Sequence, residues 1–506
     1  MKRINNYITF LFALFLVVSC DKFDEINTNP DATTKSTPSL LATGLIMDIL
    51  QTGGNKNFVY DDMLCKYIAW GDGMEDSQYN ILGRGSFGGY KILVNCEKMV
   101  SLATEKDKDA YEGLAHFIKA YKLFYISLDL GDIPYEEALQ GESGLVKPKY
   151  NTQKEVMLFV LSDLEKAYDF FSRARDFAGD PILNGHVEKW KKVVTAFQLK
   201  VLLHLSKKEA DADLQVKERF ARIVSSSSLM ESNEDNLQLV YSDKAKQIYP
   251  FHNTQTKHAG YTMLSTTVVD VFKATKDYRL FYYASPALAK LKEGLTAADW
   301  DAYLGTDPSL PFPEVKKAFT LENFSRLNPR YTDLPAGEPL IRLGYAEQNF
   351  ILAEAVLRGW IGGDAAAYYK KGIRASMDFI TSYTPDEETY HHGRPLTEEV
   401  KNACLEHPEI QLSGDKEKDM EKVLTQRYLA SFFQHPYDPY YDYRRTGYPV
   451  LPVNPETNQN PVHDKIPVRW MYPQSEYDYN KEHVEEAVQR QYGGVDDLNK
   501  EMWILQ

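Results

Sequence analysis

Along much of the chain, apolar residues recur three and four positions apart, which is the spacing of one face of an α-helix. The clearest case spans residues 342–379, where Gly359 and the pair Gly362-Gly363 separate two such stripes. Glycine ends a helix, and Asp364 can cap the next one. Because so short a link makes two helices antiparallel, the pattern predicts a helical hairpin.

The same spacing predicts further helices. They are expected at residues 38–50, 57–69, 90–103, 111–128, 152–171, 187–205 and 416–434. From about 230 to 340 the period weakens, which indicates short helices and long loops, and the C-terminal part looks irregular. Residues 70–90 are rich in Gly, Asp and Ser and should form a loop. We predict an all-α fold of tetratricopeptide-like helical hairpins with a loop-rich face, although an ordinary αα-hairpin would give the same pattern at 342–379.

The N-terminus has the pattern of an export signal. Lys2 and Arg3 precede an apolar stretch, residues 7–18, that is too short to span a bilayer. The stretch ends in Ser19-Cys20, which resembles a bacterial lipobox and so implies cleavage before Cys20 and its acylation. An ordinary secretory peptide with a chance cysteine is the alternative. We predict a signal peptide over 1–19, a lipidated flexible tether over 20–37, and a single domain over 38–506.

Composition excludes several classes of function. A formal charge of −14 over 506 residues argues against nucleic acid and against a basic membrane-binding face. The remaining cysteines, Cys65, Cys96 and Cys404, form no Cys-x-x-Cys or Cys/His pattern, so no metal site is expected. Cys65 and Cys96 could form a disulfide or could be two small buried residues. No motif suggests a cofactor.

Four segments together resemble the SusD/RagB family of nutrient-binding outer-membrane lipoproteins, and its second SusD-like branch in particular. They are Gly131–Ala138, Trp190–Ser206, Tyr443–Pro449 and Ile466–Asn480. The chain departs from the family at 196–198, where Ala-Phe-Gln replaces the usual Asn-Ser, and at His483, where the family often has Asn. Both departures concern packing positions.

The resemblance implies one α-helical body, anchored by lipid at the outer membrane and exposed on the cell surface. It also implies a partner, a SusC-type TonB-dependent transporter, over which this protein would form a lid. A tether of this length reaches only roughly 20–25 Å, so the body should stay close to its anchor. Family ligands are often glycans and sometimes peptides.

A glycan binder needs aromatic faces for sugar C–H surfaces and polar side chains for hydroxyl groups. In the family, the ligand face is made by loops after the early helices and by a mid-chain excursion. The residues of those regions expected to bind ligand are Trp70, Tyr79, Asn80, Arg84, Tyr283, Trp300 and Tyr303. Packing between helices is the alternative role for each of them.

An enzyme would need a reactive set, and the sequence shows none of the common motifs: Gly-x-Ser-x-Gly, His-Glu-x-x-His and the Walker loop are absent. Glycoside hydrolysis needs two carboxylates, but a solvated acidic loop explains Asp72, Glu75 and Asp76. We predict a non-enzymatic binder that delivers its ligand to a transporter. A secreted helical glycan hydrolase and a tetratricopeptide-like protein adaptor are the alternatives.

Overall fold

The computed structural model describes residues 36–434 and 437–506, and the predicted signal peptide, Cys20 and the tether up to residue 35 lie outside this part. The described chain is dominated by helices, as the all-α prediction states. The longer helices are α3 (Pro38–Leu50), α4 (Asn57–Leu64), α5 (Val94–Leu102), α6 (Lys108–Leu130), α7 (Gln153–Arg173), α8 (Val187–His204), α9 (Val216–Ser226), α10 (Thr266–Thr275), α13 (Phe312–Thr320), α14 (Tyr345–Leu357), α15 (Ala365–Ser382), α17 (Glu398–Leu405), α18 (Lys416–Ala430), α19 (Asp438–Thr446) and α21 (Lys481–Tyr492). The short ones are α11 (Leu280–Tyr283), α12 (Leu288–Lys292), α16 (Glu388–His391) and α20 (Gln474–Tyr479).

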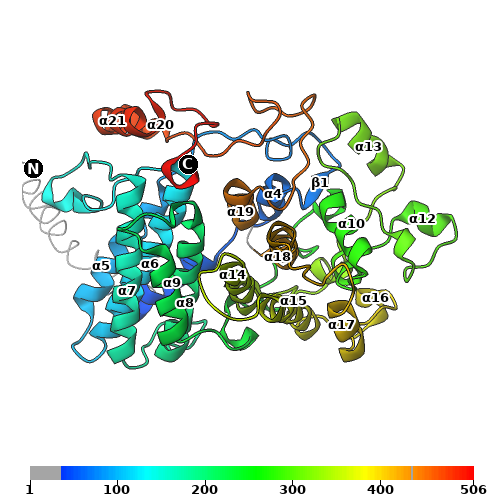
Figure 1. Cartoon of the computed structure of the whole chain (residues 1–506), viewed down its shortest axis with the longest axis horizontal. Coiled ribbons are helices and arrows are strands. Elements are labelled where there is room, and N and C mark those ends of the chain that lie inside the picture. The colour runs from blue at the N-terminus through cyan, green and yellow to red at the C-terminus, as the bar shows by residue number, and fades with distance from the viewer. Residues whose placement is uncertain (1–35, 435–436) are drawn as a thin grey trace, which may run out of the picture.

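Helices α5 to α9 stand side by side in one half of the molecule, on the left in Figure 1. The sequence marks their ends clearly. Thr152 and Glu155 form a reciprocal capping box at the start of α7. Helix α6 stops at Gly131, whose φ of 92° favours glycine. Local capping and apolar periodicity therefore agree in this half, and the predicted helices are found there.

The hairpin predicted at 342–379 is confirmed as α14 and α15, in the centre of Figure 1. The Asp364 side chain caps α15 by accepting a hydrogen bond from the Ala366 N–H at 2.9 Å. Gly372 allows the close approach of α14, because a Cβ at that position would lie 2.8 Å from the Phe350 ring. The hairpin packs on α18 and α8 and so joins the two halves of the molecule.

Two boundaries differ from the sequence prediction. The helix expected over 57–69 ends at Leu64, because Lys66 has a φ of 59° and Ile68–Trp70 forms strand β1. β1 pairs antiparallel with β3 (Thr262–Leu264), a partner almost two hundred residues away that local periodicity cannot reveal. The C-terminal part, expected to be irregular, contains α19, α20 and α21.

The region from 230 to 340 has the predicted short helices and long loops, on the right in Figure 1. A second two-stranded sheet, β2 (Leu237–Leu239) with β4 (Leu340–Leu343), closes it. Buried ion pairs hold its interior. Arg330 lies 2.7 Å from Glu338, and both side chains are almost fully enclosed.

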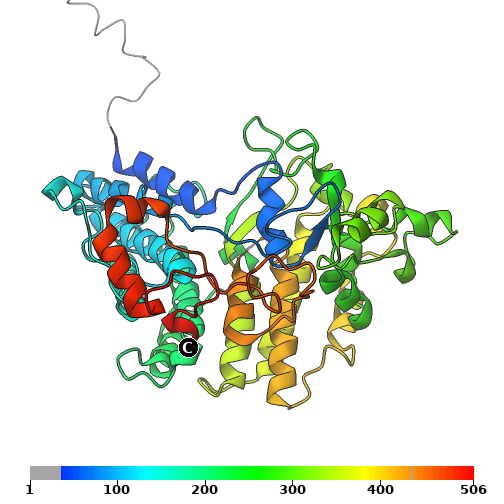
Figure 2. The same cartoon turned by 90° about the horizontal axis from the view of Figure 1, so that it is seen from above.

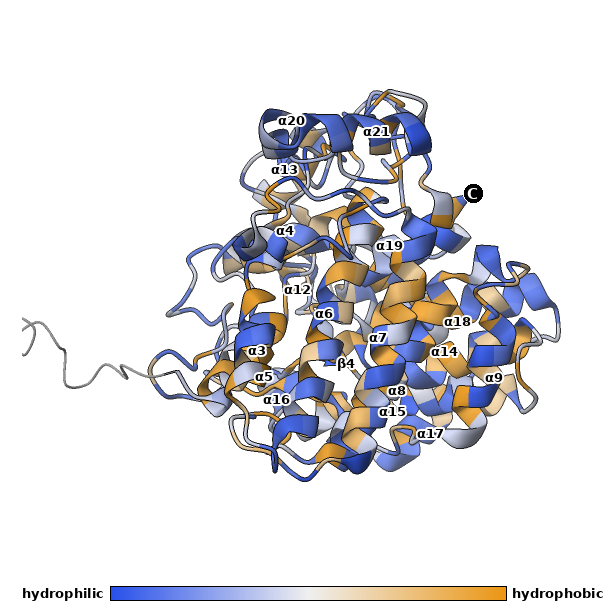
Figure 3. Cartoon of the chain, turned by 90° about the vertical axis from the view of Figure 1, so that its left-hand side faces the viewer, coloured by the Kyte–Doolittle hydropathy of each residue, from blue (hydrophilic) through white to orange (hydrophobic). Residues whose placement is uncertain are grey.

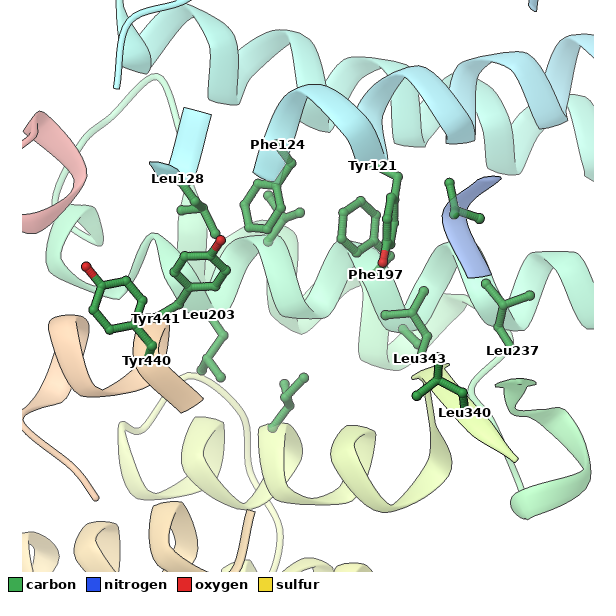
Figure 4. Packing of buried hydrophobic residues seen from close by; sticks show 14 of the residues in the cluster. Tyr121, Phe124, Leu128, Phe197, Leu203, Leu237, Leu340, Leu343, Tyr440 and Tyr441 are labelled. Atoms are coloured by element: carbon green, nitrogen blue, oxygen red, sulfur yellow. The ribbon is translucent and has the colours of Figure 1, made fainter. Parts of the chain in front are cut away.

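One large buried cluster runs from α3 to the C-terminus. Figure 4 shows part of it, where Tyr121, Phe124 and Leu128 of α6 face Phe197 of α8 and Tyr441 of α19. Helix α3, dark blue in Figure 2, packs on α5 and α6 at the edge of the helical half. This continuous core is consistent with a single domain over 38–506, whose boundaries stay a prediction.

Cys65, Cys96 and Cys404 are all buried, and no disulfide joins any of them in the described part of the chain. The interpretation of Cys65 and Cys96 as small buried residues is therefore the correct one. Within the described residues no helix is long and apolar enough to cross a membrane. Figure 3 shows that α20 and α21, at the end of the chain, are largely hydrophilic on the side facing the viewer.

Candidate functional site

The structure buries most of the residues predicted to bind ligand. The Trp70 side chain is only 1% exposed. It lies in β1 and packs near His258 and Tyr261. Tyr79 is also buried, and its hydroxyl donates to the Leu310 carbonyl at 3.0 Å.

Asn80 and Arg84 lie further along the same loop. The Asn80 side chain is buried and accepts a hydrogen bond from Lys66 Nζ at 2.8 Å. Arg84 reaches the surface, but its guanidinium donates to the Tyr472 carbonyl at 2.6 Å and lies over the Tyr477 ring. Both side chains connect this loop to other segments of the fold.

The mid-chain aromatics pack with one another. The Tyr303 side chain is fully buried, and Phe281 lies between it and the half-buried Trp300, with ring centroids 5.1 and 4.7 Å away. Tyr283 is buried against Phe432 and donates its hydroxyl to a backbone carbonyl. The structure therefore encloses the side chains of Trp70, Tyr79, Tyr283 and Tyr303. Their role as ligand contacts, like that of Asn80, Arg84 and Trp300, stays a prediction.

A different place offers a cavity. A pocket of about 450 Å³ opens where the helical half meets α4, β4 and α19. Its polar and aromatic lining residues are Asp48, Gln51, Thr52, Asp61, Tyr121, Lys122, Tyr125, Asp129, Arg342, Tyr437, Asp438 and Tyr441. We call this site the α3/α6/α19 pocket. None of the seven residues predicted from the sequence lines it.

Two tyrosine–carboxylate pairs lie in the wall of the pocket. The Tyr441 hydroxyl donates to Asp129 Oδ1 at 2.7 Å, and the Tyr437 hydroxyl donates to Asp61. Burial raises the pKa of Asp129 to about 6, although the Tyr441 hydrogen bond and Arg444 act in the opposite direction. Burial also raises the pKa of Asp61. Both carboxylates are acceptors with incomplete hydration.

The other charges of the pocket are already paired. Lys122 lies 2.5 Å from Asp48. Asp438 accepts from the fully buried Lys200 and from the Tyr125 hydroxyl. The Arg342 guanidinium donates to the carbonyls of residues 49–51 at the end of α3, at 3.0 to 3.3 Å. These contacts fix the shape of the pocket floor.

Tyr121 is the exception among the polar groups. Its side chain is only 8% exposed, and its ring packs on Phe197 and Tyr125. Within the described residues its hydroxyl makes no hydrogen bond, although it belongs to the lining of the pocket. Because the residue lines the pocket and its hydroxyl has no partner in the described part of the protein, this hydroxyl is available to a ligand.

Two further pockets lie on helical surfaces, one of about 470 Å³ beside α5 and α6 and one of about 570 Å³ beside α15. Their main charged groups are bonded to neighbouring side chains: His116 to Asp163 and Arg374 to Asp378. Among the described residues, no three His, Cys, Asp or Glu side chains gather as a metal ion would require. The α3/α6/α19 pocket therefore combines aromatic rings with available acceptors most completely, as small-molecule sites do.

Sequence reasoning missed this pocket because its parts come from α3, α4, α6, β4 and α19, which are distant in the sequence. Tyr121 and Tyr125 were assigned to a helix by their spacing, and nothing local shows that one edge of that helix stays open. The Asp-Pro-Tyr-Tyr run at 438–441 lies in the part expected to be irregular. The unusual abundance of tyrosine, 34 residues, was the available signal.

The comparisons with known proteins agree with one another. A family model named SusD-like_2 and described as starch-binding associating with outer membrane matches residues 30–473. A SusD homolog of solved structure from Bacteroides fragilis NCTC 9343 is 68% identical, with a TM-score of 0.92, over 93% of this chain and 100% of that one. A search of curated proteins gave no match.

Two further solved structures are each 34% identical over 93% of this chain and 100% of theirs. One comes from Bacteroides vulgatus ATCC 8482 and carries a name that proposes an outer-membrane role in nutrient binding, with a TM-score of 0.84. The other is a SusD homolog from Bacteroides fragilis NCTC 9343, with a TM-score of 0.82.

Proposed function

Because the chain belongs to the SusD-like family, we propose that it binds a glycan nutrient at the cell surface and delivers it to a SusC-type TonB-dependent transporter. The observation that carries this proposal is the family match over residues 30–473, whose description names both starch binding and the outer membrane. The B. vulgatus neighbour, named for nutrient binding, supports the same class of function.

The α3/α6/α19 pocket is our proposed ligand site. It offers tyrosine rings for the C–H faces of a sugar and carboxylate acceptors for hydroxyl groups. Trp300 and Arg84 reach the surface and stay predicted contacts of a longer ligand. The buried aromatics Trp70, Tyr79, Tyr283 and Tyr303 pack outside this pocket.

A glycan array followed by calorimetry tests the binding role. The protein with Cys20→Ser, which keeps the rest of the chain, should bind at least one glycan, and Tyr437→Ala should weaken that binding. Tyr479→Ala is the matched control, because Tyr479 is 76% exposed and lies outside the pocket. Turnover of the bound glycan by purified protein would favour the hydrolase alternative instead, and binding of a protein but no small ligand would favour the adaptor.

Delivery and anchoring need a second experiment. Cys20→Ala should abolish acylation and release the protein from membranes. Affinity purification of the unaltered protein from solubilised outer membranes should recover a TonB-dependent transporter in near-equal amount. If the protein is recovered alone in mild detergent with its ligand present, it is a free-standing surface binder.

A further inference from the structure

We propose that the α3/α6/α19 pocket selects a sugar that carries a primary ammonium group, as a deacetylated amino sugar does. This inference rests on the proposed function, because it names the substrate class of the same site. It starts from two carboxylates, Asp61 and Asp129, and from the unbonded hydroxyl of Tyr121.

Asp61 and Asp129 lack the counter-ions that the other carboxylates of the pocket have. Each accepts a hydrogen bond from a neutral tyrosine hydroxyl. Across the described part of the chain, no Lys, Arg or His lies within ion-pair distance of either, whereas Asp48 has Lys122 and Asp438 has Lys200. The two carboxylates also feel each other, since the charge of Asp61 raises the pKa of Asp129. No direct ion pair therefore compensates these two carboxylates, although the more distant Arg444 lowers the pKa of Asp129.

An ammonium group fits this deficit. It brings the missing positive charge and donates up to three hydrogen bonds, and charge-assisted hydrogen bonds are the stronger kind. A neutral hydroxyl can satisfy the lone pairs of a carboxylate but leaves its charge in place. The Tyr121 side chain is only 8% exposed, and its hydroxyl, which has no partner among the described residues, supplies an independent polar contact on the α6 side.

Other cationic ligands fit less well. A metal ion needs several ligands at short range, and the described acidic side chains do not gather in threes. A free peptide would bring a carboxylate as well as an amine. The cations of the pocket are already occupied, Lys122 by Asp48 and Arg342 by the carbonyls at the end of α3, so that carboxylate would have no partner.

The test compares three sugars of equal length by calorimetry at neutral pH: the glucosamine trimer, the N-acetylglucosamine trimer and maltotriose. Acetylation removes the charge and leaves most of the ring unchanged. We expect the glucosamine trimer to bind at least about tenfold more tightly than the other two, since hydrogen bonds to charged groups contribute that much.

Asp61→Asn and Asp129→Asn each remove a negative charge from the pocket and keep the shape of the side chain, so they test whether the charge determines which sugar binds. An asparagine oxygen can still accept the tyrosine hydrogen bond, so the fold and the pocket should be kept. Each variant should lose about tenfold in affinity for the glucosamine trimer and little for maltotriose. Asp301→Asn, at a highly exposed carboxylate outside the pocket, is the control and should change neither affinity.

The pH dependence gives a second readout. The titratable and charged groups that face Asp129 are Asp61 on α4 and Tyr437, Tyr440, Tyr441 and Arg444 on or beside α19. Asp129 loses its charge as the pH drops through its pKa of about 6, whereas the amine of the sugar gains charge in the same range, so the preference for the glucosamine trimer should fall relative to that of Asp129→Asn.

The outcomes distinguish this inference from the function on which it rests. If neutral sugars bind as tightly as the glucosamine trimer, or if the asparagine variants weaken all sugars equally, the ammonium inference is wrong and the binding function stands. If trilysine binds in preference to every sugar, the amino-sugar assignment is wrong. If no sugar of any kind binds, both proposals fail.

Discussion

Two groups of tyrosines in this molecule end in different surroundings. In the loop-rich half, the hydroxyls of Tyr283 and Tyr303 donate to backbone carbonyls. In the α3/α6/α19 pocket, the hydroxyls of Tyr437 and Tyr441 donate to carboxylates and that of Tyr121 has no hydrogen bond among the described residues. The comparison teaches that the partner of the hydroxyl, and not the residue type, separates a packing tyrosine from one available to a ligand.

The two regions also differ in what their tyrosines contribute. Both contain buried ion pairs, such as Arg330 with Glu338 in the loop-rich half and Lys200 with Asp438 beside the pocket. In the loop-rich half the Tyr283 hydroxyl also joins distant segments, because it donates to the Leu429 carbonyl. The Tyr121 hydroxyl, in contrast, makes no hydrogen bond among the described residues and lines the pocket. Substitution of the tyrosine should therefore affect stability in the first region and ligand affinity in the second.

The largest effect is expected for Glu338→Ala. It leaves the Arg330 guanidinium buried and without its carboxylate, and breaking a buried pair in this way costs about 3–5 kcal/mol. Urea denaturation should show this loss of unfolding free energy. Glu322→Ala, in the same region, breaks a more exposed pair with Lys292 and should cost far less stability, because solvent screens the pair. Equal costs would contradict the view that buried pairs hold this half together.

Trp70→Ala should also be strongly destabilising, by about 3–5 kcal/mol, because it removes a fully buried indole. Thermal unfolding measures the loss of stability, and calorimetry on the protein that stays folded measures ligand affinity. Unchanged ligand affinity in the folded variant would show that Trp70 has a packing role alone. A variant that keeps its stability but loses affinity would instead support Trp70 as a ligand contact. Trp300→Ala, at a half-buried ring, should destabilise less.

The replacement of tyrosine by phenylalanine makes the sharpest comparison, because it removes one oxygen in either region. Tyr283→Phe leaves the Leu429 carbonyl without its donor and should cost about 1–3 kcal/mol of stability with no change in affinity. Tyr121→Phe loses no hydrogen bond of the folded protein, so stability should hold. Its ligand affinity should fall by about 0.5–1.5 kcal/mol. If Tyr283→Phe instead lowers affinity and Tyr121→Phe lowers stability, Tyr283 is the ligand contact and Tyr121 the packing residue.

The smallest effect concerns pH. The pKa of Asp129 in the folded protein, about 6, is above the ordinary value of 3.8. The folded state therefore binds more protons than the unfolded state between these values, and this group adds stability as the pH falls from about 6 toward 4. Asp129→Asn should lack this contribution when denaturation curves at the two pH values are compared. Arg445 lowers the pKa of the buried Glu354 to about 2, so Glu354 contributes less stability as the pH falls. This contribution is the same in the unaltered protein and in Asp129→Asn, so it cancels in the comparison.

The helices could be predicted because their information is local. The stripe through Phe350 and the glycines after it fix α14 and α15 with little help from elsewhere. Strand β1 could not be predicted, since Trp70 takes its conformation from Thr262, a distant partner. The pocket could not be predicted for the same reason, because the cavity beside Tyr121 exists only through the positions of α4 and α19 in the folded protein.

The family resemblance supplied a class of function but no geometry. It pointed to the loop at 70–90 and to the mid-chain aromatics, where glycine and tyrosine are abundant. Tyrosine content alone cannot show which hydroxyls find partners in the fold. Tyr303 and Tyr121 look alike in sequence, yet one donates to a carbonyl and the other lines a cavity.

The hydrogen bonds from Arg342 to the carbonyls at the end of α3 have a mechanical consequence. A pull on the chain before Pro38 enters the body through α3 and is shared, through the guanidinium, with the start of the central hairpin. Traction on the N-terminus would then move the two halves of the molecule as one piece instead of peeling off the first helix. In a pulling experiment, Arg342→Ala should therefore lower the force at which α3 detaches, while Lys56→Ala, after that helix, should not.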